Sequence, residues 1–572
     1  MRPLLRLAAL SVLLLNACYP AGDGKAPPLE ELYFPTGVAL DGLSASDQGD
    51  GAPKYLYVAN SDFDLQYRSA SLISYDLDLL RQVVPQNCKT NDDCEASGKI
   101  CDAPGQEGIP TADPNRVPSY YCVEPGEAKP CGDFGDRDEA DLVLYPGRCQ
   151  SVEPLAPQDG TESLLVDKVG IGAFATDVLW RANPDTDAMY PSRLFVPVRG
   201  DSTLHWIDVK EGKFSCGQGG GEDDGCDDQH RSGEEGSDNI YNRTQPSEPY
   251  AVDATNDGAF VAITNQTSGS VSLFHNDWRS DGGPKLVDIV DGLPFAPVAI
   301  AALPDPVFAN GAQQAPGFLV AYRTAPQVDL LRVRADDADT GTALTPYIRY
   351  TLRRAGSAPI NANSLGFDSR GIAIDDEQRQ ADYAACDEQF GDCSVSPDPI
   401  QCQADLTGCL RAVHQPGVYV ASRAPSSLLV GAMTADVGYP SGTSELPSFT
   451  DSIALTFGPS RVIVGDVKVP GTASSVLRDL SGPYEYERRI FVVCFDSRRI
   501  FVYDPKRRVL DAIVSTGRGP YALAVDRVRG LAYLGHFTDS YLGVISLDQR
   551  FPQTYATIVA SIGTPKAPRS SK

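Results

Sequence analysis

The stretch "GPYALAVDRVRGLAYLGHFTDSYLGVISLD", from Gly519 to Asp548, decides the fold of this chain. It holds three short apolar segments, Tyr521–Val525, Leu531–Leu534 and Leu542–Ile545, and turn-forming residues separate them. Short segments rich in Val, Leu and aromatic residues, bounded by Gly, Asp and Ser, are typical of β-strands. The stretch therefore predicts three consecutive strands connected by tight turns.

The same pattern recurs along the chain. The middle segment returns as "YLYVAN" (Tyr55–Asn60), "RLFVPV" (Arg193–Val198), "AFVAIT" (Ala259–Thr264), "GFLVAY" (Gly317–Tyr322), "GVYVAS" (Gly417–Ser422) and "RIFVVC" (Arg489–Cys494). Small antiparallel sheets cannot cover both of their faces alone, whereas radial stacking covers both and leaves only short edges. We count seven units and predict an all-β fold, a seven-bladed β-propeller of four-stranded antiparallel sheets over residues 33–563. The unit around Ser364–Asp376 is the least clear, so six or eight blades are alternatives.

The repeats resemble a known group of propellers. "LYVAN" followed by "SLISYDLD", and "GPYALAVD" before "LAYLGH", are similar to the YVTN-type repeats of bacterial surface and periplasmic proteins. The same resemblance extends to lactonase-like propellers and runs from about Phe34 to Gly563. It implies a fold rather than an activity, because propellers carry many unrelated functions.

The N-terminus indicates export. Arg2 and Arg6 lie beside the apolar run Leu7–Leu15, which has the layout of a signal peptide over residues 1–17 and is too short to span a bilayer. The string "LNAC" ending at Cys18 resembles the bacterial lipobox, whose cysteine is acylated; simple secretion is the alternative. We expect a lipidated tether over residues 18–32 that anchors the protein to the membrane. Because Tyr19 rather than Asp follows the cysteine, an outer-membrane location is favoured, on the periplasmic or surface side of the cell envelope.

The cysteines agree with export. Apart from Cys18 and the isolated Cys494, which we predict to be a buried thiol, they form three groups with even counts, as expected for disulfides. These groups are Cys88, Cys94, Cys101, Cys122, Cys131 and Cys149; Cys216 and Cys226; and Cys386, Cys393, Cys402 and Cys409. A zinc site is the alternative, but no CxxC pair occurs. The pairing within the larger groups cannot be deduced from the sequence.

Three inserts interrupt the repeats. Residues 88–149 form a Cys-rich insert that resembles small modules of Gram-negative bacteria, residues 212–246 are acidic and Gly-rich, and residues 377–411 form a second Cys-rich insert. Residues 564–572 are expected to be a disordered tail. No part of the chain shows a long helical period.

The charge limits the possible partners. The chain has 76 acidic and 49 basic residues and a net charge of −27, which disfavours binding to nucleic acid. Within this acidic chain, Arg199, Arg323 and Arg423 follow the middle segment of three different units. If they converged at the mouth of the channel, they would form a ligand-binding site for a carboxylate or phosphate. The alternative is that each one pairs with a neighbouring acidic residue.

Catalytic motifs are lacking in the sequence. HExxH, GxSxG, P-loop and CxxCH patterns do not occur, and we expect no cofactor and no metal, although calcium at an acidic loop is an alternative. His536 is a weak candidate for a catalytic base. The sequence therefore favours a non-catalytic envelope lipoprotein that uses a propeller platform to bind protein or glycan. The alternative is a periplasmic or surface hydrolase that resembles lactonase-like propellers and binds an anionic substrate at the arginines.

Overall fold

The computed structural model describes residues 25–42, 51–84, 87–88, 100–101, 120–123, 151–155, 157–158, 162–184, 191–217, 225–234, 243–278, 283–304, 315–336, 349–360, 368–391, 393–434, 446–471, 484–552 and 554–566. Within these residues β-strands dominate. The α-helices are α2 (Leu77–Val83), α4 (Glu377–Phe390) and α5 (Pro399–Arg411).

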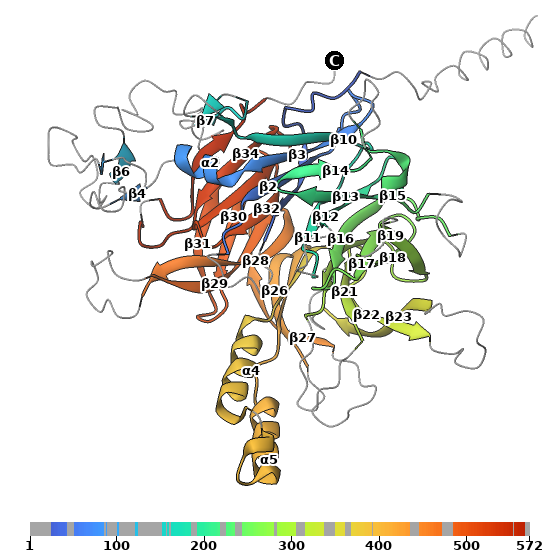
Figure 1. Ribbon diagram of the computed structural model, residues 1–572, viewed down its shortest axis with the longest axis vertical. Helices are drawn as coiled ribbons and strands as arrows, with labels where there is room; N and C mark the ends of the chain where they lie inside the picture. Colours follow the sequence, from blue (N-terminus) through green and yellow to red (C-terminus); the bar gives the residue numbers. More distant parts are fainter. Residues whose placement is uncertain are drawn as a thin grey trace, which may run out of the picture.

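Seven antiparallel sheets follow one another along the chain and form the blades of a propeller (Figure 1). Blade 1 consists of β1 (Pro35–Leu40), β2 (Tyr55–Asn60), β3 (Ala70–Asp76) and β10 (Leu165–Ile171), and blade 2 of β11 (Leu179–Arg181), β12 (Ser192–Val198), β13 (Thr203–Lys210) and β14 (Lys213–Ser215). Blade 3 consists of β16 (Pro249–Ala254), β17 (Phe260–Asn265), β18 (Ser270–Asn276) and β19 (Pro284–Val290). Blade 4 consists of β20 (Pro297–Ala302), β21 (Gly317–Tyr322), β22 (Gln327–Asp336) and β23 (Arg349–Pro359). A short strand, β15 (Arg231–Ser232), also pairs with β13.

Blade 5 consists of β24 (Ser369–Asp375), β25 (Gly417–Arg423), β26 (Ser426–Met433) and β27 (Pro447–Ala454). Blade 6 consists of β28 (Pro459–Pro470), β29 (Tyr484–Cys494), β30 (Arg499–Asp504) and β31 (Val509–Ser515). Blade 7 consists of β32 (Pro520–Asp526), β33 (Leu531–His536), β34 (Tyr541–Ser546) and β35 (Thr557–Ile562). The first strand of each blade is the innermost, because the first strands of neighbouring blades contact one another. The predicted seven-bladed propeller is confirmed, and the unit that was least clear in the sequence supplies β24, the inner strand of blade 5.

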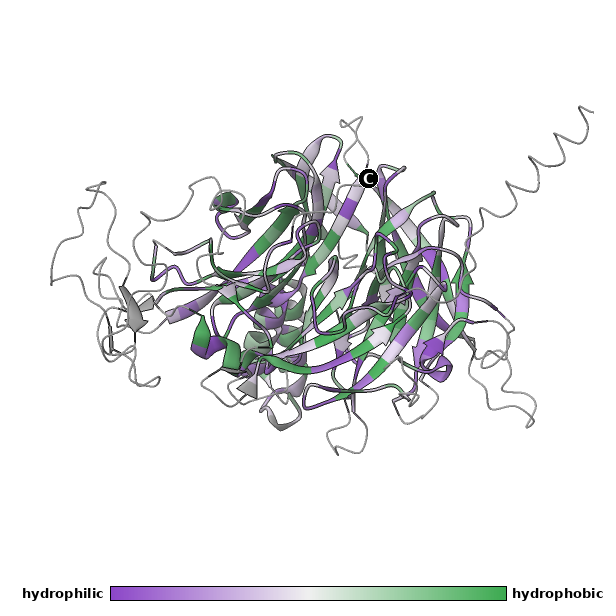
Figure 2. Ribbon diagram, turned by 90° about the horizontal axis from the view of Figure 1, so that it is seen from above, coloured by the Kyte–Doolittle hydropathy of each residue, from purple (hydrophilic) through white to green (hydrophobic). Residues whose placement is uncertain are grey.

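Apolar packing joins each blade to the next. The second strands are buried on both faces, and hydrophobic and hydrophilic residues alternate along many of the outer strands (Figure 2). Seven apolar clusters occupy the described interior, and each lies at one boundary between blades. One of them joins blade 7 to blade 1, where Tyr533 and Val544 pack with Val58 and Ile73. The ring is therefore closed by side-chain packing of the same kind at every boundary.

Among the described residues each blade is built from strands that are consecutive within its own unit, and a short strand covers the last edge. β7 (Ser151–Val152), which lies between the first Cys-rich insert and β10, pairs in parallel with β35 of blade 7. The N–H of Gly563 donates to the carbonyl of Val152 over 2.9 Å, and the side chain of Val152 is buried. A segment from blade 1 thus shields the outermost strand of blade 7.

The inserts project from this ring. Between β24 and β25, α4 and α5 form a hairpin that extends away from the body of the molecule (Figure 1). Short strands also occur in the first insert and after it: β4 (Asn87–Cys88), β6 (Tyr120–Val123) and β5 (Ile100–Cys101) form one small sheet, and β8 (Pro157–Gln158) pairs with β9 (Glu162–Ser163). None of the helices in the described part of the chain is both long and apolar enough to cross a membrane.

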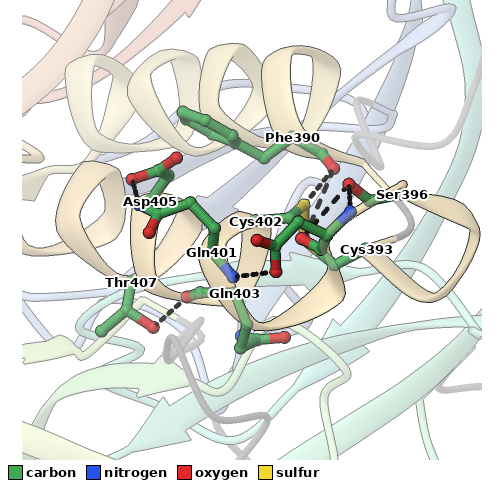
Figure 3. The surroundings of a disulfide bond; sticks show 9 residues. Phe390, Cys393, Ser396, Gln401, Cys402, Gln403, Asp405 and Thr407 are labelled. Atoms are coloured by element: carbon green, nitrogen blue, oxygen red, sulfur yellow. Dashed lines mark hydrogen bonds between the residues drawn. A yellow bond between two sulfur atoms is a disulfide. The ribbon is translucent and has the colours of Figure 1, made fainter.

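Disulfides hold the helical hairpin together. Cys386 pairs with Cys409 and Cys393 pairs with Cys402, while Cys216 pairs with Cys226 in blade 2. The carbonyl oxygen of Phe390 lies 3.7 Å and 3.5 Å from the sulfur atoms of Cys393 and Cys402 (Figure 3). The sequence shows no long helical period here, because disulfides rather than an apolar face hold these helices together, and Asp398 caps the N-terminus of α5. The pairing of the six cysteines in residues 88–149 lies outside the described residues.

Candidate binding site at the channel mouth

One backbone arrangement recurs at the same end of all seven blades. In six blades the residue directly before the inner strand has a positive φ, and in blade 2 the corresponding residue is Phe174, which lies a few residues before β11. In every blade the carbonyl of this residue accepts the N–H of the residue that ends or follows the second strand. These donor and acceptor pairs are Ser61 and Phe34, Arg199 and Phe174, Gln266 and Glu248, Arg323 and Ala296, Arg423 and Asp368, Phe495 and Gly458, and Phe537 and Gly519. Antiparallel pairing places the start of the inner strand beside the end of the second strand, so these residues encircle one end of the channel. We call this end the mouth.

The three predicted arginines occupy equivalent positions at the mouth, and each is paired with an acidic residue of the next blade. Arg199 lies 2.6 Å from a carboxylate oxygen of Glu248, and Arg323 lies 3.5 Å from one of Asp368. Arg423 donates to the carbonyl of Pro459 over 3.1 Å and lies 3.6 Å from a carboxylate oxygen of Asp496. These ion pairs and hydrogen bonds therefore connect each blade to the next. A ligand-binding role for these arginines stays a prediction, and it would require these pairs to open.

His536 lies inside blade 7 and is fully buried. Its ring stacks on that of Tyr541 with centroids 4.0 Å apart, and its Nε2 accepts the backbone N–H of Gly517 over 3.1 Å. Burial lowers the pKa of His536 to about 3, so the imidazole is neutral at ordinary pH. A catalytic role for His536 also stays a prediction. None of its described contacts involves the three arginines.

Aromatic side chains from blades 1, 2, 6 and 7 gather at the mouth. Phe34 and Phe63 of blade 1, Phe174 of blade 2, Phe495 of blade 6, and Tyr521 and Phe537 of blade 7 form a connected set with ring centroids 5.1 to 6.4 Å apart. We call this set the apolar arc. Phe537 lies at its centre and contacts Phe34, Phe63, Phe495 and Tyr521.

Part of the apolar arc is open to solvent. Phe63 is 53% exposed, and the nearby Leu65, in the same turn, is 64% exposed. Two more exposed side chains at this end, Phe295 (58%) and Phe457 (78%), each precede a residue with positive φ. Large apolar side chains gathered on one face commonly mark an interaction surface.

A polar network closes the channel beneath the arc. Arg461 of β28 lies 3.0 Å from both carboxylate oxygens of Asp177, which precedes β11 on another side of the ring. The guanidinium of Arg461 also lies over the ring of Tyr521, at 4.7 Å, and the hydroxyl of Tyr521 is 2.9 Å from that of Tyr250. Burial raises the pKa of the Asp177 carboxyl, and the charge of Arg461 partly offsets this effect. These four side chains join blades 2, 3, 6 and 7 across the channel.

Two β-bulges help to place these tyrosines. The pairing of inner and second strands shifts register between Pro249 and Val252 in blade 3, and between Pro520 and Leu523 in blade 7. Bulges re-aim side chains, and Tyr250 and Tyr521 each lie within one of them. The apolar arc was not predicted from the sequence, although Phe495 and Phe537 occupy the position in their repeats that Arg199 occupies in blade 2.

Cys494, which is unpaired in the described part of the chain, is buried, as predicted. Burial raises the pKa of its thiol to about 12, so it is unreactive at neutral pH. Among the described residues, no group of three or more His, Cys, Asp or Glu side chains is arranged to hold a metal ion.

Solved structures provide distant matches. A protein from Lactobacillus plantarum is 12% identical, with 85% of this chain and 86% of the other covered and a TM-score of 0.39. Proposed 6-phosphogluconolactonases from Bacteroides uniformis and Bacteroides fragilis are each 9% identical over the same shares of the chains, with TM-scores of 0.40 and 0.38. No protein-family model and no curated protein matches the sequence. The structural matches are too distant to carry an argument about activity.

Proposed function

We propose that this protein is an exported, lipid-anchored binding propeller that docks a protein partner at the apolar arc. The exposure of Phe63 and Leu65 beside the packed rings of the apolar arc is the observation that carries the proposal. Exposed aromatic and aliphatic side chains around a packed centre are typical of protein interfaces. The expected partner presents a segment with apolar side chains and little charge.

The chemistry of the mouth favours a protein partner over a glycan. Sugar hydroxyls need many hydrogen-bonding groups, but the ring atoms of the phenylalanines provide none, and the hydroxyl of Tyr521 is already engaged with Tyr250. An anionic substrate is less favoured because Arg199, Arg323 and Arg423 each have an acidic neighbour.

Export and anchoring are also part of the proposal. The disulfides of the described chain are typical of proteins that fold outside the cytoplasm. Acylation at Cys18 would place the propeller at a membrane surface through several acyl chains. The mass of the N-terminal peptide of the mature protein tests this part. A peptide that begins at Cys18 and carries acyl groups supports it, and an unmodified Cys18 contradicts it.

The binding face can be tested in two steps. A photo-cross-linking amino acid at position 63 in the anchored protein should capture a protein that the same group at Ile400 does not capture; Ile400 is 85% exposed on the helical hairpin. Calorimetry with the purified partner should then show about tenfold weaker binding for Phe63→Ala and for Leu65→Ala, and no change for Ile400→Ala. Binding should have a negative heat-capacity change, because apolar surface is buried.

Other outcomes would overturn the proposal. Binding of purified oligosaccharides that Phe63→Ala abolishes would make the mouth a glycan site. Turnover of a phosphorylated lactone that Arg199→Met and Arg323→Met abolish, while Phe63→Ala retains it, would make the protein a hydrolase of the alternative kind.

A further inference from the structure

The outer edges of two blades are covered by segments from elsewhere in the chain. In blade 7, β7 pairs in parallel with β35 at Ser561 and Ile562, near the end of that strand. In blade 1, Gly225 forms a parallel bridge with Gly170 of β10, and the N–H of Cys226 donates to the carbonyl of Gly170 over 3.1 Å. Both covering segments therefore lie on the half of an outermost strand that is nearer the mouth.

Blade 6 has the same edge without such a cover. β31 is the outermost strand of this blade, and in the described structure β30 is the one strand that pairs with it. Val514 of β31 pairs with the second residue of β30, just as Ile562 of β35 pairs with the second residue of β34. The stretch 513–515 therefore corresponds to the part of blade 7 that β7 covers.

The backbone of this stretch is oriented to accept a further strand. The N–H of Thr516 donates inward, to the carbonyl of Arg498 over 3.0 Å. Backbone groups of successive residues point to opposite sides of a strand, so the N–H and carbonyl groups of Ser515 and Ile513 point away from β30. None of the backbone hydrogen bonds within the described residues involves these outward groups. Such groups at the edge of a sheet are a template for strand addition.

β31 also exposes apolar side chains. Ile513 is 47% exposed, Val509 is 50% exposed and Leu510 is 38% exposed. In the part of the chain that the structure describes, the outermost strands of the other six blades expose no large apolar side chain. A segment that lies along β31 would remove these three side chains from water, which is favourable.

Exposed cations lie at both ends of β31, although the chain as a whole is strongly acidic. They are Lys506, Arg507 and Arg508 directly before the strand, and Arg498 and Arg499 beside its end. The nearby carboxylates of Asp504 and Asp511 both pair with the buried Arg489, and Asp504 also lies 3.6 Å from Arg507. A second copy of β31 would bring like charges together in either direction of pairing, whereas an acidic segment would bring opposite charges together.

We propose that β31 is a docking edge for an extended acidic segment of another protein, which adds to blade 6 as a fifth strand along residues 513–515. The outward backbone groups supply main-chain hydrogen bonds, the exposed aliphatic side chains contact apolar residues of the segment, and the cations pair with carboxylates at its two ends. The added strand is expected to be parallel to β31, as the covers of blades 7 and 1 are to their strands. The edge lies at the outer rim of the propeller and does not depend on a partner at the apolar arc.

Calorimetry with defined peptides tests the chemistry of the segment. The probe is a synthetic peptide of alternating Val and Thr with two Glu at each end, titrated into the full-length protein. The same peptide with Lys in place of Glu should bind about tenfold more weakly or not at all, and so should one with Pro at its centre, which cannot pair as a strand. Equal binding of the Glu and Lys peptides, or no binding of the Glu peptide at millimolar concentration, would overturn the proposal.

Variants of β31 test where the peptide binds. Ser515→Pro removes one outward N–H without breaking a hydrogen bond to β30, and it should weaken binding of the Glu peptide by about tenfold. Ser515→Ala keeps the N–H and is the matched control, which should bind as the parent does. Arg508→Glu should weaken binding by several-fold at low salt and less at high salt, which keeps the test decisive if Ser515→Pro does not fold. Binding that neither Ser515→Pro nor Arg508→Glu weakens would overturn the site.

Other occupants of the edge give different results. A photo-cross-linking amino acid at position 513 should link to the Glu peptide and, without the peptide, should not link to the same chain. Cross-links to residues 88–149 of the same chain would show that the edge is covered internally and would overturn the proposal. A dimer in analytical ultracentrifugation that Ser515→Pro abolishes would assign the edge to a second copy. Binding to anionic vesicles that Arg508→Glu abolishes and Ser515→Pro retains would assign it to a membrane surface, and either result would overturn the proposal.

Discussion

The two halves of the mouth use the same backbone positions for opposite purposes. In blades 6 and 7 the position after the second strand holds Phe495 and Phe537, which build the apolar arc. In blades 2 and 4 it holds Arg199 and Arg323, which tie each blade to an acidic residue of the next. The repeat therefore determines where a side chain projects, and the residue at that position determines whether the mouth is open to a partner or closed by ion pairs.

The largest effect is expected where the two halves are joined. Arg461→Met leaves Asp177 without its partner in a largely enclosed channel and should lower the free energy of unfolding by about 3 kcal/mol. Chemical denaturation measures this change. Arg461→Met combined with Asp177→Leu should recover much of the loss. Arg507→Met is the matched control, since its side chain is 66% exposed, and it should have little effect.

Mild acid should lower the stability of the blade that carries Phe537, because His536 lies buried in the same blade. The folded pKa of His536 is about 3 and the ordinary value is 6.5, so below pH 6.5 the unfolded chain binds the proton more readily. The stability due to the neutral ring is complete above pH 6.5 and falls with pH down to about 3. The loss should reach about 2 kcal/mol at pH 5.

His536→Gln should flatten this dependence in denaturation curves measured between pH 5 and 7. His414→Gln should retain it, because the His414 side chain is 69% exposed and lies on the insert side of blade 5. An unchanged slope in His536→Gln would show that another group titrates.

The centre of the apolar arc should be sensitive to truncation. Phe537→Ala removes four aromatic contacts and should cost about 1 to 2 kcal/mol of stability, and Phe537→Leu should cost less. Thermal unfolding measures both. If Phe537→Ala is as stable as the parent, the rings of the apolar arc do not support one another.

The smallest effect is expected in the ion-paired half. The hydrogen bond from Thr267 lowers the pKa of Glu248, burial opposes this, and Arg199 adds to it. The stability from this carboxylate is present above its ordinary pKa of 4.5 and is lost as the pH falls further. Glu248→Gln should cost less than about 1 kcal/mol at pH 7, because the pair is partly exposed, and its deficit should vanish in acid. A deficit that persists at pH 3 would assign the effect to packing.

Much of the fold could be predicted from the sequence because it depends on local pattern. Seven repeats of alternating apolar residues predicted the blades, and Arg199, Arg323 and Arg423 occupy equivalent positions in them, whereas their ligand-binding role stays a prediction. The helices were missed because they carry no apolar stripe, although Cys402 and Cys409 are seven residues apart, which places them on one side of α5.

The apolar arc could not be predicted from the sequence for a different reason. The ring centroids of Phe34 and Phe537 are 5.1 Å apart, although almost the whole propeller separates the two residues in the sequence. Such contacts exist only after the ring closes. Nothing in the repeat pattern distinguishes a phenylalanine that faces solvent from one that packs in a blade.

The pairing of β35 with β7 has a consequence for the order of assembly. The partner of the last strand, Ser151–Val152, leaves the ribosome some four hundred residues before it. During folding, this short segment stays unpaired until blade 7 forms, so a second chain could pair with it first. The folding chain is therefore most prone to associate with other copies of itself in the interval before blade 7 forms.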